Sequence, residues 1–106
     1  MIFPEHMKTK DKIEFLQRYI LVHSYLYYEL NESVISDKKF DKKARLLASK
    51  VDKYKSRMKS TQYGYVFYDF DGTTGFDLFD RLNEQDKKQI VHIAYLVLRL
   101  YKGEYR

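Results

Sequence analysis

The sequence predicts a mainly α-helical domain, made of an antiparallel helical hairpin and a buried C-terminal helix, with a short β-strand or hairpin insertion near residues 62–72. The first observation behind this prediction is that apolar residues recur at intervals of three and four over long stretches, which is typical of amphipathic helices. The second is that one proline and four glycines are the only strong breakers in 106 residues. The length suits a single domain over residues 1–106, with the hairpin in residues 9–60 and the other elements in residues 61–106.

The first helix of the hairpin is predicted to span about twenty residues, with Thr9 or Asp11 capping its start. Its apolar stripe consists of Ile13, Leu16, Ile20, His23, Leu26, Tyr27 and Leu30. Residues 31–33 break this spacing. The first helix is therefore expected to end near Leu30.

The second helix is predicted to start at Ser36, whose hydroxyl is a suitable N-cap, with the Asp37 carboxylate in the first turn, where the helix dipole favours negative charge. Steps of four and three separate the members of its stripe, which are Phe40, Ala44, Leu47, Val51, Tyr54 and Met58. A short link between two striped helices predicts that they pack against each other in antiparallel directions.

The spacing changes after Ser60. Residues 62–70 are rich in the β-formers tyrosine, valine and phenylalanine, and residues 71–75 are typical of a turn, so this segment predicts a strand. The segment from Phe76 to Leu82 is expected to form a short helix capped by Thr74, with a returning strand as the alternative.

The last helix is predicted to run from Glu84 to Tyr101. Asn83 and Asp86 resemble a capping box at its start, and Gly103 is a suitable stop. Because the helix is apolar nearly all round from Ile90 onward, it is expected to be the most buried element.

Composition excludes several kinds of protein. The absence of cysteine rules out a disulfide scaffold, a thiol nucleophile and cysteine-ligated metals. No apolar run reaches the roughly 18–20 residues of a membrane span, and the first residues lack the order of a signal peptide. We therefore expect a cytoplasmic protein, of a bacterium or an infected host, with no membrane partner.

Charge is distributed unevenly along the chain. Residues 38–59 contain ten Lys and Arg and two Asp, a net charge of +8, whereas residues 61–86 contain six Asp and Glu and one Arg, a net charge of −5. The overall charge of +5 is therefore the remainder of two opposed segments, and each has to be considered separately as a site for partners.

One constellation of residues lies where the two predicted helices meet. His23 is followed by Tyr27-Tyr28, and after a short turn Ile35-Ser36-Asp37 precedes Phe40-Asp41. Over roughly residues 13–57, this pattern resembles the N-terminal domain Ia of bacterial NAD-dependent DNA ligases. In that family the helical hairpin clamps the nicotinamide mononucleotide (NMN) half of NAD.

The resemblance implies a role for each matching residue. Tyr27 and Phe40 would stack on the nicotinamide ring, Asp37 and Asp41 would accept hydrogen bonds from amide or ribose groups, and Tyr28 would approach the phosphate. Physical chemistry agrees with these roles, because residues four apart share a helix face and aromatic rings suit a cationic ligand. The cofactor expected from the resemblance is NMN or NAD, without a metal.

The chain also departs from the family pattern. Phe40 replaces a tyrosine, Tyr28 stands where some members have histidine, and Ser33 replaces a frequent proline. The nucleotidyltransferase motif Lys-x-Asp-Gly is missing, since Lys50-Val51-Asp52-Lys53 lacks the glycine. We therefore expect a non-catalytic module that binds a nicotinamide nucleotide or docks on a larger protein, and by analogy a phage or mobile-element origin.

The alternative is an accessory or inhibitor protein that acts on a host protein or nucleic acid through the basic helix and the acidic segment. Nucleic acid would bind through Lys38–Lys59. However, the Lys and Arg of this segment surround the apolar stripe, which is typical of an ordinary solvated helix.

Two further motifs are set aside. Residues 65–73 match the first motif of haloacid-dehalogenase-type phosphatases, but those enzymes need a parallel sheet and later Lys and Asp motifs, for which the residues after 73 offer no match. The same residues do not fit the spacing of an EF-hand calcium loop, because its fifth position would be Thr73 and its twelfth would be Asp80 instead of the usual glutamate. His6, His23 and His92 are isolated and lack metal-ligand spacing, and His23 is expected to be a hydrogen-bonded core residue.

Overall fold

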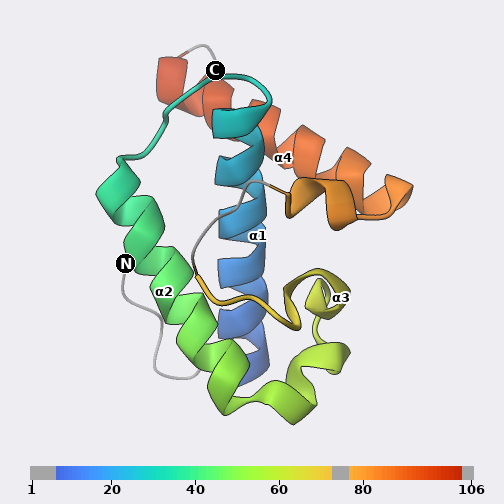
Figure 1. Cartoon of the computed structure of the whole chain (residues 1–106). Helices are drawn as coiled ribbons and strands as arrows, with labels where there is room; N and C mark the ends of the chain where they lie inside the picture. Colours follow the sequence, from blue (N-terminus) through green and yellow to red (C-terminus); the bar gives the residue numbers. More distant parts are fainter. Residues whose placement is uncertain (1–6, 73–76, 104–106) are drawn as a thin grey trace.

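The computed structural model describes residues 7–72 and 77–103, and it confirms a mainly helical fold. The elements are α1 (Thr9–Tyr28), α2 (Asp37–Lys53), the 3-10 helix η1 (Lys55–Ser60), α3 (Gly64–Phe67), the 3-10 helix η2 (Phe79–Arg81) and α4 (Glu84–Lys102). Figure 1 shows α1 between α2 on one side and α4 on the other, with α2 running antiparallel to α1. The predicted helical hairpin is therefore present.

Helix α1 contains more buried residues than any other element of the described chain. Its apolar stripe is covered on both sides, and its buried members include Ile13, Leu16, Ile20, Leu21 and Leu26. Apolar burial on this scale stabilises a fold by roughly 1.5–3 kcal/mol for each fully buried large side chain. Both α2 and α4 pack on α1, so the surface of α1 sets their orientations.

The prediction that the last helix is the most buried element is wrong. In α4, Ile90 and Ala94 are buried, whereas Leu100 and Tyr101 are 63% and 59% exposed. The physical reason is geometric: α4 crosses the C-terminal half of α1, and its own C-terminal end extends past that contact (Figure 1). An apolar helix is buried only where another element packs against it.

Two predicted helix starts are confirmed. Ser36 Oγ accepts a hydrogen bond from the backbone N–H of Lys39 at 3.2 Å, and Asn83 Oδ1 accepts one from Asp86 N–H at 2.8 Å. The start of α1 differs from the prediction, since Lys8 occupies the N-cap position and no side chain caps the helix there. Thr9 and Asp11 instead lie inside the first turn.

The capping box at α4 is completed in an unexpected way. Asp86 is one methylene shorter than the usual glutamate, and the Tyr65 hydroxyl bridges the gap. The Asn83 N–H donates to Tyr65 Oη at 3.2 Å, and that hydroxyl donates to Asp86 Oδ2 at 2.6 Å. Burial and the bond to Asp86 together raise the pKa of Tyr65 to about 12, so the hydroxyl keeps its proton. At the other end of α4, Gly103 adopts φ of 70° and stops the helix as predicted.

The predicted strand near residues 62–72 is wrong, because the described part of this segment forms the helical turn α3 and no strand. The buried side chains of the segment are Tyr63, Val66, Phe67 and Phe70. They are spaced at three, four and seven residues, which is a helical period, so the β-forming composition was the misleading signal. This also removes the strand on which a phosphatase-type nucleophile would sit.

Gln17 attaches this segment to α1. Its side chain is fully buried, its Nε2 donates to Thr61 Oγ1 at 2.9 Å, and its Oε1 accepts from Tyr63 N–H at 3.2 Å. Nε2 also lies 3.6 Å from Met58 Sδ. A buried amide is tolerated when its donor and acceptor are both satisfied, and here it orders the turn between η1 and α3.

The expected helix over Phe76–Leu82 is found in part, as the single turn η2. Thr74 and Phe76 lie outside the described residues. Arg81 of η2 donates to Asp69 at 2.8 Å and to the carbonyl of Val66 at 3.1 Å, which fixes the acidic turn that follows α3. No helix in the described part of the chain is both long enough and apolar enough to cross a membrane.

Candidate functional site

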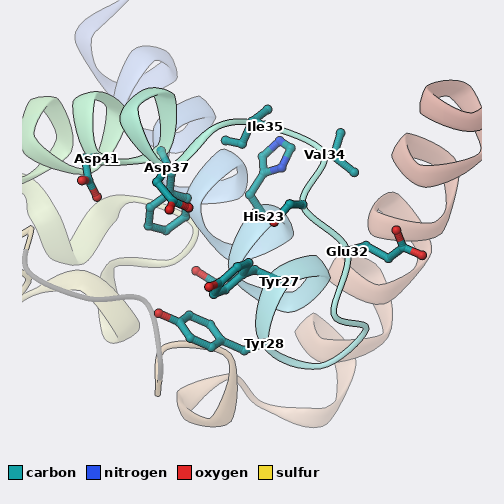
Figure 2. Close-up of a pocket in the computed structure, with 11 residues that line it drawn as sticks. His23, Tyr27, Tyr28, Glu32, Val34, Ile35, Asp37 and Asp41 are labelled. Atoms are coloured by element: carbon teal, nitrogen blue, oxygen red, sulfur yellow. The ribbon is translucent and has the colours of Figure 1, made fainter.

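A pocket of about 280 Å³ lies where the two helices of the hairpin meet. Its walls are the last turns of α1, the link over residues 29–36 and the first two turns of α2. All five residues singled out from the sequence line it: Tyr27, Tyr28, Asp37, Phe40 and Asp41. The fold therefore brings together residues from two helices that the sequence separates by a turn (Figure 2).

The link that shapes this pocket is held in its N-terminal part. The Glu32 N–H donates to the carbonyl of Leu26 at 2.8 Å, and Asn31 adopts the left-handed φ of 55° that this reversal requires. The Glu32 carboxylate forms an ion pair with Lys102 of α4 at 3.1 Å, and Figure 2 shows Glu32 directed away toward α4. Although Glu32 borders the pocket, its carboxylate is therefore paired with Lys102.

Two tyrosines form one side of the pocket. Tyr27 and Tyr28 are 46% and 42% exposed, so both side chains lie at the surface and not in the core. Their rings meet edge to face, with centroids 4.9 Å apart. In Figure 2 both hydroxyl ends point toward the side on which Asp37 and Asp41 lie. Part of the Tyr27 ring surface is thus exposed at the pocket.

The opposite side is formed by α2. Asp37 and Asp41 lie one turn apart, both are exposed, and Phe40 beside them is half-buried and packed on the core. The Ser36 cap fixes the start of α2 and hence the direction in which these side chains project. Two carboxylates and an aromatic ring on a single helix face suit a cationic, planar group.

Six of the eleven lining residues were not predicted as part of the site, and two of these six, His23 and Ser24, are polar side chains of α1. Ser24 is 2% exposed, and its Oγ is buried without a hydrogen-bond partner among the described residues. His23 also lines the pocket, where its ring lies 4.6 Å from that of Tyr19. The sequence held one signal for them, namely two adjacent polar residues on an otherwise apolar part of α1. An orphaned buried hydroxyl is costly unless something binds it.

Burial lowers the pKa of His23 from its ordinary 6.5 to about 4. The folded protein thus holds a neutral imidazole where the unfolded chain would take up a proton below pH 6.5. The stability contributed by neutral His23 is present in full above about pH 6.5 and is lost as the pH falls toward 4. Since the ring is partly exposed, we discount the effect to about 1 kcal/mol at pH 5.

His23→Gln is therefore expected to flatten the pH dependence of the free energy of unfolding between pH 7 and pH 4.5. Denaturant titrations at several pH values measure this, with His92→Gln on the exposed side of α4 as the matched control. A His23→Gln variant with the same pH slope as the parent would contradict the assignment.

The other motifs considered from the sequence do not form a second candidate site among the described residues. Within residues 7–72 and 77–103, no group of three or more His, Asp and Glu is placed to hold a metal ion. Lys50-Val51-Asp52-Lys53 lies inside α2, and Asp69 is engaged by Arg81. Among the described residues, the five candidate residues meet in the hairpin pocket.

Comparison with known proteins finds a short similarity. Over 33 residues, 31% of this chain, it is 52% identical to the DNA ligases of Buchnera aphidicola subsp. Acyrthosiphon pisum strains 5A, APS and Tuc7. That segment is 5% of each ligase, so the chain matches only a small part of these curated relatives. No family model and no solved structure matches the chain. The chain thus contains a ligase-like segment.

Proposed function

We propose that this protein is a non-catalytic module that binds a nicotinamide nucleotide, NMN or the NMN half of NAD, in the hairpin pocket. The observation that carries the proposal is that Tyr27, Tyr28, Asp37, Phe40 and Asp41 line one pocket. The resemblance of these residues to ligase domain Ia, and the 33-residue similarity to DNA ligases, support the same ligand.

The chemistry of the pocket fits the ring of this ligand. Oxidised nicotinamide is flat and positively charged, and the faces of Tyr27 and Phe40 are negative above their rings. Because His23 is neutral at pH 7, no positive charge from it opposes the ligand. Asp37 and Asp41 add attraction, although the protein as a whole has a net charge of +5.

The polar groups of the pocket fit the rest of the ligand. Ser24 Oγ, which is buried without a partner among the described residues, would pair with the carboxamide. The carboxylates of Asp37 and Asp41 would accept from ribose hydroxyls, and the Tyr28 hydroxyl would approach the phosphate. A buried donor that gains a partner only in the complex favours binding by removing its desolvation cost.

Calorimetric titration with NMN tests the proposal. We expect a dissociation constant below about 1 mM, with a stabilisation of roughly 2.7 kcal/mol when NMN is present at 100 times that value. Asp37→Asn, which keeps the shape of the side chain, should weaken binding about tenfold by removing one carboxylate charge.

AMP is the matched ligand control, because it has a ribose and a phosphate but no cationic ring. It should bind at least tenfold more weakly than NMN. No heat and no thermal shift with millimolar NMN would sink the proposal, and so would equal binding of AMP and NMN.

A further inference from the structure

The outward side of α2 carries a row of basic side chains that the pocket does not use. At about 100° per residue, its exposed lysines and arginine fall within one arc of about 120°. They are Lys38, Lys39, Lys42, Arg45 and Lys53, and we call them the basic face. The arc is centred roughly opposite the buried residues Ala44, Leu47 and Val51.

The acidic residues of α2 lie elsewhere on the helix. Asp37 and Asp41 line the hairpin pocket, and Asp52 lines a second depression beside Asp69 and Asp71. The three carboxylates thus share one flank of α2, and the basic face contains none of them. The expectation that Lys and Arg simply surround the apolar stripe is therefore replaced by a helix with separate acidic and basic sides.

The charge of the basic face is not neutralised within the described chain. The ion pairs found there use Arg81, Lys87 and Lys102, and none uses a member of the basic face. Three further cations, Lys55, Arg57 and Lys59, are exposed in η1, and Lys55 lines the second depression together with Asp52, Asp69 and Asp71. Lys53 also lowers the pKa of the neighbouring Tyr54, as expected in a positive field.

We propose that the basic face binds the phosphate backbone of double-stranded nucleic acid without regard to base sequence. From Lys38 to Lys53 the row is about 22 Å long, and a duplex carries one charge per ~1.7 Å of axis, so several phosphates lie within its reach. In Figure 1, α2 lies along one edge of the molecule, which leaves this side open to a large partner.

The composition of the face favours a duplex over a membrane surface or a single strand. A helix that lies on a membrane needs a free apolar side, but the apolar side of α2 is buried against α1. Binding of single strands relies on exposed aromatic rings for base stacking. The largest apolar residue within the arc is Leu46, which is 36% exposed, and the arc contains no aromatic residue.

Fluorescence anisotropy with a labelled duplex of about 20 base pairs tests the proposal on the full chain. We expect micromolar binding at 50 mM salt that weakens steeply and linearly on a log–log plot as salt rises. The double variant Lys42→Glu/Lys53→Glu should bind at least tenfold more weakly at 100 mM salt and reduce the salt slope by about two.

The control is Lys10→Glu/Lys88→Glu, which changes the net charge equally at exposed positions on α1 and α4. It should stay within about threefold of the parent. No duplex binding at 50 mM salt, or equal losses in the two double variants, would overturn the proposal. Tighter binding to a single strand of equal length, or to anionic phosphatidylglycerol vesicles, would overturn the choice of partner.

Discussion

Replacing Gly64 with alanine is expected to destabilise the fold by about 3 kcal/mol, the upper end of overpacking effects. A Cβ at this position would overlap the carbonyl oxygen of Met58 and lie 2.9 Å from its carbonyl carbon. Both are backbone atoms, so the strain cannot be relieved by rotating a side chain. Relief requires η1 and α3 to separate, and this would break the hydrogen bonds of Gln17 to Thr61 and Tyr63.

Thermal and denaturant unfolding measure this effect, and the melting temperature should fall by about 10 °C or more. Gly103→Ala is the matched control, because Gly103 has φ of 70° and nothing within 4 Å of an added Cβ. Its loss of stability, about 1 kcal/mol, therefore reports only the cost of placing alanine in a left-handed backbone conformation. A Gly64→Ala protein as stable as Gly103→Ala would show that η1 and α3 do not pack as described.

Removing the ring of Tyr27 is expected to weaken NMN binding about 30-fold, or about 2 kcal/mol. The Tyr27 side chain is 46% exposed in the free protein, so its loss leaves the core unchanged while removing one face of the proposed clamp. Tyr27→Phe should bind within about threefold of the parent, because stacking depends on the ring more than on the hydroxyl.

Tyr68→Ala is the control, because Tyr68 is an equally bulky residue, 56% exposed, that lies outside the hairpin pocket. Calorimetry with NMN on the three variants separates the two positions. Equal affinities of Tyr27→Ala and Tyr68→Ala would exclude Tyr27 from the binding site.

The helices and most of their ends could be predicted because their causes are local. The stripe of α1 repeats over twenty residues, and Ser36, Asn83 and Gly103 act on backbone groups within one turn. The predicted start of α1 is wrong because Thr9 and Asp11 can cap a helix but lie inside the first turn.

The errors concern properties that depend on distant parts of the chain. Tyr63, Val66 and Phe67 have β-forming side chains, but Gln17, more than forty residues away, holds this segment in a turn. The burial of α4 depends on how much of its length packs against α1. The spacing of apolar residues within α4 does not reveal this length.

The candidate site shows the same division. Its five matching residues came from the resemblance to ligase domain Ia, whereas the burial of the unpaired Ser24 hydroxyl and the partial burial of the His23 ring are visible only in the folded hairpin. The separation of acidic and basic sides on α2 required only helix geometry, and it was obscured by counting the charges of the whole segment together.

The central proposal is that a nicotinamide ring lies between Tyr27 and Phe40, and proton NMR of the protein with saturating NMN tests it most directly. We predict nuclear Overhauser effects from the nicotinamide ring protons to the ring protons of both residues, and their loss in Tyr27→Ala. Ring protons that show effects only to residues outside the hairpin pocket, or none at millimolar NMN, would contradict the proposal.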